Sequence, residues 1–351
     1  MSKCRALLLL LLLGGAMGCS GCSPVYVWRG AVAQGRILLS REPITRVLAS
    51  DRLTPQQRDR LALVQEVRRF ASEELGMDVG GAYGSYAEVP PGALVWVVSA
   101  ARQTRLESYT WWFPIVGRVA YKGFFEESEA EALAAELREE GWDIYLRTSS
   151  AFSTLGWFDD PVLSSWLKRD EVALADLVLH ELLHRSFYLS GHTDFNESFA
   201  SWVGHAGARQ FFARRDGADA ETTRRAEERY GRAMHASTRF DQAIATLRAL
   251  YEKAEREKWA RARTLAAREE IFATLGPVGK VNNAVILARW AYRKDLGDFA
   301  CAAAARGGSL RDQIAGIEAL ATDADDPFAA IACSEAAIYS GQSEGASPGR
   351  L

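Results

Sequence analysis

The chain has 351 residues, 48% of them hydrophobic, and its 42 Lys and Arg nearly balance 45 Asp and Glu, for a net charge of −3. This length is sufficient for a large core with two lobes. The charge gives no reason to expect nucleic-acid binding. Beyond the leucine-rich start of the chain, no second apolar stretch is long enough to cross a membrane.

The N-terminus has the features of an export signal. Two basic residues precede seven consecutive leucines, Leu7 to Leu13, and small residues follow. The apolar run is too short to span a membrane and is typical of a secretory signal peptide. A cysteine directly after small residues resembles a lipoprotein cleavage site, and both Cys19 and Cys22 fit. We expect residues 1–22 to form a lipoprotein signal, cleaved before Cys19 or Cys22.

Such processing would leave the protein lipid-anchored at the periplasmic side of a bacterial membrane, with the outer membrane favoured over the inner. The alternative is a soluble secreted protein that is cleaved nearby. An oxidising compartment would also permit Cys301 and Cys333, the cysteines in the body of the chain, to pair. The sequence leaves open whether they form a disulfide or remain two buried thiols.

The first half of the mature chain changes its hydrophobic period. Two helices are predicted first, at 26–48 and 55–76, and the period then becomes that of strands. The pattern predicts a small sheet with one helix inserted, from strands at 94–98, 115–121 and 143–148 and a helix at 128–140. We assign 23–165 to an N-terminal α/β lobe.

Residues His180-Glu181-Leu182-Leu183-His184 have the pattern H-E-x-x-H, in a chain with only five histidines. The preceding residues 171–179 contain no Gly or Pro and are apolar at helical spacing, which predicts a buried helix. Side chains four apart lie on one helix face, so both imidazoles can bind one Zn²⁺. Glu181, at the edge of that face, would then act as general base on a metal-activated water without being a ligand.

A catalytic zinc normally takes a third protein ligand. The metzincin pattern would need Gly and His where this chain has Phe187 and Ser190, so that class is excluded. Helix-capping residues instead introduce a second helix that carries Glu197. A short connection would fold this helix back on the first, and we expect one zinc ion at His180, His184 and Glu197. The alternatives are a purely structural cluster, core histidines, or a contribution from His192 in the connecting loop.

The C-terminal region is predicted to be helical. A long charged run at 218–275, broken at Gly276-Pro277, most simply forms a solvated face. A last strong helix is predicted at 282–296, and 341–351 should form a flexible tail. We assign 166–340 to a helical metallopeptidase lobe.

Several segments together resemble a bacterial family of lipoproteins described as predicted aminopeptidases, and the resemblance covers roughly 21–300. The downstream N-E-x-F-A element is also similar to gluzincin aminopeptidases, in which its Glu completes the zinc site. The resemblance implies a zincin-like α+β fold, predominantly helical, with a small sheet packed on an active-site helix pair and a long helical C-terminal region. The segments that carry it are 21–26, 112–117, 153–161, 180–184 and 195–200.

The same resemblance suggests further site residues. Zincins place a substrate-binding strand just upstream of the zinc helix, although core packing is an equal alternative for this segment. Gluzincins bring an oxyanion stabiliser from a downstream helix, for which Tyr292 is the candidate, with a structural role as the alternative. Asn196, beside the third ligand, is a further substrate-binding candidate. The upstream strand candidates are Ser153, Thr154, Leu155, Gly156 and Trp157.

We therefore expect zinc-dependent hydrolysis of peptides or unfolded proteins in the cell envelope, of aminopeptidase type. The alternative is a noncatalytic lipoprotein scaffold that a zinc ion stabilises, and a third possibility is an amidase acting on cell-wall peptides. An intact Glu181 favours an enzyme, because a structural zinc site has no use for a general base.

Overall fold

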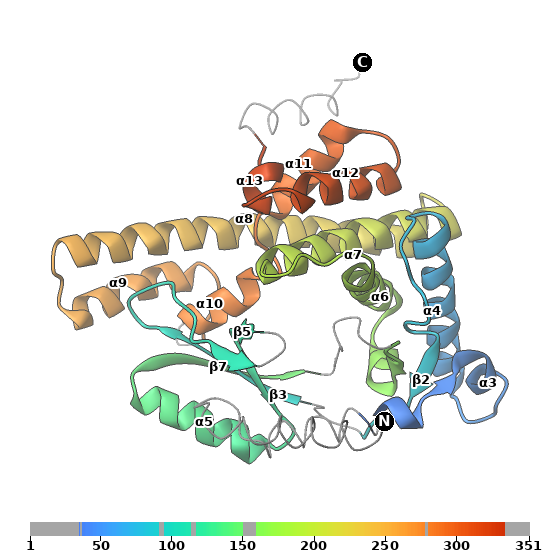
Figure 1. Ribbon diagram of the computed structural model, residues 1–351, viewed down its shortest axis with the longest axis horizontal. Helices are drawn as coiled ribbons and strands as arrows, with labels where there is room; N and C mark the ends of the chain where they lie inside the picture. Colours follow the sequence, from blue (N-terminus) through green and yellow to red (C-terminus); the bar gives the residue numbers. More distant parts are fainter. Residues whose placement is uncertain are drawn as a thin grey trace, which may run out of the picture.

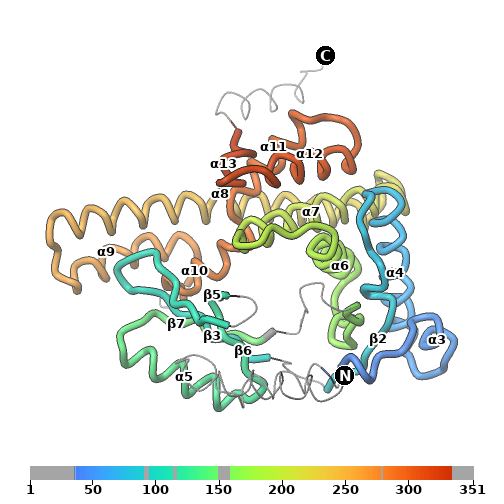
Figure 2. The backbone as a smooth tube through the Cα atoms, in the orientation of Figure 1, coloured from blue at the N-terminus to red at the C-terminus, as the bar shows by residue number. Residues whose placement is uncertain are grey.

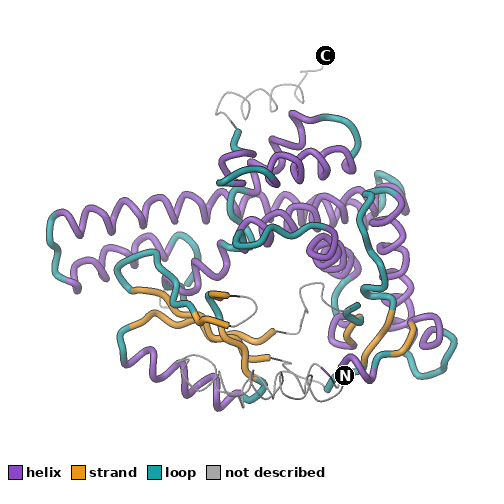
Figure 3. The backbone as a smooth tube through the Cα atoms, viewed as in Figure 1, coloured by secondary structure: helices purple, strands orange, loops and turns teal. Residues whose placement is uncertain are grey.

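The computed structural model describes residues 35, 37–90, 95–113, 117–149, 159–277 and 280–333. The fold is α+β and predominantly helical with small sheets, as expected from the sequence. Figures 1 and 2 show the long helix α8 (Glu221–Arg256) running across the molecule, with the last helices on one side of it and the sheets on the other. The strands gather in separate small sheets, which Figure 3 shows in orange.

The largest core surrounds a helix pair, α6 (Glu171–Ser186) and α7 (Thr193–Asp216), and α4 (Pro55–Glu73) packs against α6. A capping box at Thr54 and Gln57 starts α4, with Pro55 in the first turn. Beside α4 lie α3 (Ile44–Leu48), the 3₁₀ helix η2 (Ser164–Lys168), and a small sheet of β1 (Glu42–Pro43), β2 (Ser85–Ala87) and β8 (Val162–Leu163).

A second sheet has the order β6-β3-β7, all antiparallel, with β3 (Val95–Arg102) between β6 (Lys122–Phe124) and β7 (Trp142–Ser149). One face packs on helix α5 (Glu127–Glu139) through Ala130, Ala134 and Leu137, which recur at helical spacing. The other face contacts α10 (Asn283–Trp290). Two further short strands, β4 (Trp111–Phe113) and β5 (Gly117–Val119), form a hairpin.

Helix α8 packs against α7 and against α9 (Arg261–Ala273), and the last helices α11 (Leu296–Arg306), α12 (Leu310–Thr322) and α13 (Pro327–Ile331) follow α10. A disulfide joins Cys301 on α11 to Cys333 after α13, with 6.2 Å between their Cα atoms. The pairing that the sequence left open is therefore formed.

Several predicted boundaries are corrected. The first helix is interrupted by strand β1 at Glu42–Pro43. Among the described residues of the predicted strand 115–121, β5 covers Gly117–Val119, after which the chain turns before β6. The charged run breaks earlier than expected, between α8 and α9, where Lys258 takes a positive φ of 52°. The predicted helix 282–296 ends at Trp290, and three more helices follow its turn.

A buried ion pair joins the sheet to the C-terminal helices. Arg268 of α9 donates hydrogen bonds of 2.7 and 3.0 Å to the two carboxylate oxygens of Asp143 on β7. The backbone N–H of Asn283, at the start of α10, donates to the same carboxylate.

Within the described ranges, none of the helices combines the length and apolarity needed to span a bilayer. Cys19, Cys22 and the 341–351 tail lie outside the described residues.

Candidate metal centre

Helix α6 begins at a capping residue, Asp170, whose carboxylate accepts a hydrogen bond from the backbone of Ala173. Ten of its 16 residues are buried, which agrees with its apolar sequence. After α6 the chain turns at Gly191, whose φ of +85° favours glycine, and α7 begins two residues later. This short connection allows α7 to fold back along α6.

A glycine and a buried carboxylate hold the two helices close together. A Cβ atom on Gly204 of α7 would lie 2.5 Å from Oδ1 of Asp176 on α6, so only glycine permits this approach. Asp176 accepts a 2.6 Å hydrogen bond from Nε of Arg229 on α8 and lies 3.1 Å from Nδ1 of His205 on α7. The three helices are thus joined one turn before His180, the first histidine of the H-E-x-x-H motif.

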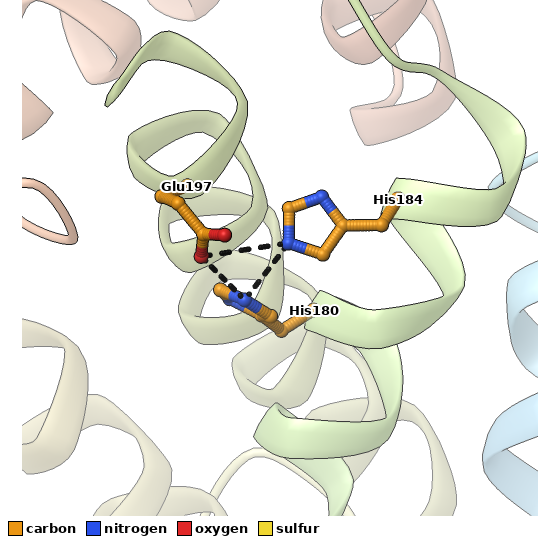
Figure 4. Close-up of side chains that lie close together, drawn as sticks. All are labelled: His180, His184 and Glu197. Atoms are coloured by element: carbon orange, nitrogen blue, oxygen red, sulfur yellow. Dashed lines mark hydrogen bonds and ion pairs between the residues drawn. The ribbon is translucent and has the colours of Figure 1, made fainter. Parts of the chain in front are cut away.

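The three predicted ligands converge (Figure 4). The Nε2 atoms of His180 and His184 are 3.2 Å apart, and Oε2 of Glu197 lies 3.4 Å from the first and 3.6 Å from the second. Four ligands at zinc–ligand bonds of about 2.0–2.1 Å would be separated by about 3.3 Å in a tetrahedron. Two imidazole nitrogens and one carboxylate oxygen at this spacing fit Zn²⁺, and the cluster can hold a metal ion.

The electrostatics of the cluster also suit a cation. Burial acts to raise the pKa of Glu197, but hydrogen bonds with His180 and His184 hold it well below its usual range. Burial acts to lower the pKa of His180, but the Glu197 carboxylate and the nearby Glu181 raise it. A carboxylate that stays ionised between two imidazoles is a ready acceptor for a divalent cation.

Glu181 lies next to the cluster without joining it. It follows the ligand His180 on α6 and is partly buried. Burial raises the pKa of Glu181, the two imidazoles oppose this, and the carboxylates of Glu197 and Asp160 add to it. The residue therefore has the place that the H-E-x-x-H pattern gives to a general base.

A cavity of about 630 Å³ adjoins Glu197 and is lined by segments of β3, β5, β7, α7, α10 and α13. Tyr292 lines it and stacks beside His180, with 6.2 Å between ring centroids and 24° between ring planes. Tyr292 lies in the turn after α10, rather than on a helix as expected. The charge of Glu197 and burial raise the pKa of the Tyr292 hydroxyl far above its usual range.

The turn that carries Tyr292 is fixed by hydrogen bonds from two helices. Ser198, the residue after Glu197 on α7, donates to the backbone oxygen of Ala291 at 3.1 Å. Ser237 of α8 donates to the backbone oxygen of Arg293 at 2.6 Å. The backbone on both sides of Tyr292 is therefore held against α7 and α8.

Sequence reasoning missed three residues of this region. Tyr121, in the turn between β5 and β6, is 44% exposed and lines the cavity. Burial raises the pKa of Tyr121 most, and the charge of Glu197 raises it further. Tyr188, just after α6, raises the same pKa. Arg147 of β7 lines the cavity as well. No motif marks these residues, and Tyr121 and Arg147 reach the cavity only through the position of the strands.

The other candidate residues are placed less directly. Asn196 is only 3% exposed, and its side-chain amide is hydrogen-bonded in both directions to the backbone of Leu189. It therefore closes the turn between α6 and α7 and does not line the cavity. His192 lines the cavity but is not one of the clustered ligands. The proposed substrate strand lies outside the described residues: Ser153, Thr154, Leu155, Gly156 and Trp157.

Comparison with known proteins gives the family of the chain. Neither the curated proteins nor the solved structures contain a match to it. One family model matches residues 25–327, a stretch that includes the clustered ligands, Glu181 and Tyr292. Because this match covers most of the chain, the protein belongs to the family described as "Putative aminopeptidase".

Proposed function

We propose that the protein is a zinc-dependent peptidase in which His180, His184 and Glu197 hold one Zn²⁺. The observation that carries this proposal is the spacing of the three donor atoms, 3.2 to 3.6 Å, which matches one tetrahedral ion. Family membership supports peptide hydrolysis. The partly buried Glu181 beside the ligands supports a catalytic role over a purely structural one.

A bound zinc ion supplies a Lewis acid that lowers the pKa of water and polarises a peptide carbonyl. Glu181 then takes the proton of the attacking water and returns it to the nitrogen that leaves. Tyr292, which stacks on His180, would donate a hydrogen bond to the carbonyl oxygen as negative charge develops there. The buried helix pair keeps these groups in fixed positions.

One residue of the cavity wall supports an aminopeptidase over other kinds of peptidase. Asp194 lies one turn before Glu197 on α7 and lines the same cavity. A carboxylate at this position suits the free ammonium group of a peptide N-terminus. Peptides or loosely folded envelope proteins are the proposed substrates.

The location is proposed from the sequence pattern alone. Lipid modification of Cys19 or Cys22 would hold the enzyme at the periplasmic side of the membrane, with the outer membrane favoured. Intact-mass measurement of membrane-extracted protein should give a lipid-modified cysteine at position 19 or 22. A mature chain that begins at any other residue would contradict the anchor.

Glu181→Gln separates an enzyme from a scaffold. The change preserves the shape of the residue but removes its basic oxygen, so zinc content and melting temperature should stay close to wild type. Cleavage of a responsive peptide should fall at least about 100-fold. Glu228→Gln, the same change at an exposed position of α8, should leave all three properties unaltered.

Zinc content is measured by elemental analysis and cleavage by mass spectrometry on a mixed peptide library. Equal cleavage by zinc-loaded Glu181→Gln would assign the activity to another site or a contaminant. In that case the zinc-stabilised scaffold would be the better description.

A further inference from the structure

The wall of the cavity contains an arginine that pairs with none of the residues that the structure describes. On β7, Asp143, Tyr145 and Arg147 alternate with Trp142, Ile144 and Leu146, which pack on the α5 side of the sheet. Asp143 and Arg147 therefore lie on the opposite face, toward α10 and the cavity. This one strand face places two charges near the metal centre.

The inner charge of this face is neutralised, whereas the outer one has no ion-pair partner among the described residues. Arg268 pairs with Asp143, and both side chains are less than 10% exposed at 8% and 6%. Arg147, four residues further along β7, makes no hydrogen bond or ion pair with any residue in the part of the chain that the structure describes. A partly buried guanidinium at a cavity wall carries five N–H donors and is a site for an acceptor group.

The other cations of the cavity are already engaged. Nζ of Lys294 lies 3.7 Å from the centre of the Phe328 ring, and Nη1 of Arg118 donates to Oγ1 of Thr110 at 3.2 Å. Both belong to the wall of the same cavity. Arg147 is thus the cavity cation best placed to bind an anionic group of a ligand.

Arg147 is also close to the reacting groups. Its charge acts to lower the pKa of both Tyr121 and Tyr292, against the effects of burial and of Glu197. Because Tyr292 stacks on His180, a group held by Arg147 lies near the bond that the metal centre would cleave. The cavity volume of about 630 Å³ is within the range of small-ligand sites and accommodates a short peptide.

We propose that Arg147 binds a carboxylate of the substrate close to the cleaved bond. The planar guanidinium matches a carboxylate with two parallel hydrogen bonds, which a neutral amide cannot reproduce. The carboxylate is either the free C-terminus of a short peptide or the side chain of an Asp or Glu. This assignment rests on the proposed peptidase function and adds a substrate class to it.

Matched peptides distinguish the two sources of the carboxylate. The first pair is a short responsive peptide with a free C-terminus and its C-terminal amide. The second pair carries Glu or Gln next to the cleaved bond, in a peptide with an amidated C-terminus. Wild type should cleave one acidic member about 10- to 100-fold more efficiently in kcat/KM than its neutral partner. The pair that shows the preference identifies the source.

Arg147→Gln should reduce this preference to less than about 3-fold, without lowering kcat/KM for the neutral peptides by more than about 3-fold. Arg147→Lys should retain part of the preference, because lysine keeps the positive charge but cannot make the two parallel hydrogen bonds of a guanidinium. Arg138→Gln, which removes an exposed arginine from α5 on the far face of the sheet, should keep the full preference. Equal losses for acidic and neutral peptides in Arg147→Gln would overturn the proposal in favour of a role toward Tyr292.

Binding provides a readout that does not need turnover. Calorimetry with zinc-loaded Glu181→Gln protein should show the same acid-over-amide preference, and adding Arg147→Gln should remove it. If no peptide is cleaved but this binding preference is found, the peptidase function fails and the carboxylate site stands. If peptides are cleaved without any acid preference, the peptidase function stands and the carboxylate site fails. A preference that survives Arg147→Gln but disappears in His184→Ala would place the carboxylate on the metal and overturn the proposal.

Discussion

The phenol ring of Tyr292 lies nearly parallel to the imidazole ring of His180, at 24° and 6.2 Å between centroids. The two residues come from distant parts of the chain, and helix α7 links their positions. It carries Glu197, which contacts His180, and Ser198, which holds the backbone beside Tyr292. One helix therefore positions both Glu197 and the backbone beside Tyr292.

His184→Ala should abolish stoichiometric zinc binding. The remaining His180 and Glu197 offer only two donors, where a catalytic zinc normally has three protein ligands. Elemental analysis of the purified mature domain should give one zinc per chain for wild type and little for the variant. His192→Ala, which removes a histidine from the cavity wall, should keep its zinc. Full zinc content in His184→Ala would show that the ligand assignment is wrong.

Tyr292→Phe should lower kcat by about 10² to 10³ with zinc content unchanged, because it removes one hydrogen-bond donor for the developing oxyanion. The melting temperature should change little. Tyr121→Phe is the matched comparison, since this second tyrosine also lines the cavity beside Glu197. Steady-state kinetics on one responsive peptide compares the two. A larger loss in Tyr121→Phe would transfer the oxyanion role to Tyr121.

Asp143→Asn should destabilise the fold by about 3 to 5 kcal/mol, because the buried Arg268 guanidinium would lose its neutralising charge. Urea unfolding at constant zinc measures the free energy of unfolding. Glu221→Gln, which breaks the exposed pair with Arg224 on α8, should cause no measurable change. Similar small effects in both variants would mean that the sheet and α9 are not held by this ion pair.

Removing the disulfide with Cys301→Ser and Cys333→Ser should cost about 3 to 4 kcal/mol, from the chain-entropy estimate for a loop with a sequence separation of 32. Because Pro327 and Phe328 of α13 line the cavity, peptide KM should also rise. Dithiothreitol should lower the melting temperature of wild type and have no effect on the double variant. Wild type that is insensitive to dithiothreitol would contradict a stabilising bond.

Asp295 should make the fold less stable as pH rises. Burial and the neighbouring Asp241 raise the pKa of Asp295 to about 6, against an opposing effect of Lys294. A raised folded-state pKa means that the folded protein binds more protons than the unfolded chain between about pH 4 and 6, so the free energy of unfolding falls across that interval. Solvent screening of this half-buried group limits the loss to the order of 1 kcal/mol.

Asp295→Asn tests this linkage without disturbing the backbone, because Asn tolerates the left-handed conformation at φ 53°. The variant should match wild type near pH 4 and be more stable by about 1 kcal/mol at pH 7. Denaturant titrations of both proteins between these values give the difference directly. A difference that does not depend on pH would refute the assignment.

The amino-acid sequence by itself predicted the cluster of His180, His184 and Glu197 that the structure shows. The spacing of His180 and His184 places both on one face of any helix, because that follows from 3.6 residues per turn. The short connection to Glu197 leaves the second helix few directions other than back along the first. Local geometry of this kind needs no knowledge of the rest of the fold.

The tertiary structure decided the rest of the site. The turn of Tyr292 was predicted as helix, but hydrogen bonds from Ser198 and Ser237 hold the backbone of this turn. Arg147 and Tyr121 reach the cavity because the sheet packs against α10 and because Arg268 secures Asp143. These contacts join residues far apart in the chain, and hydrophobic periodicity, which reports only on near neighbours along one element, contains no information about them.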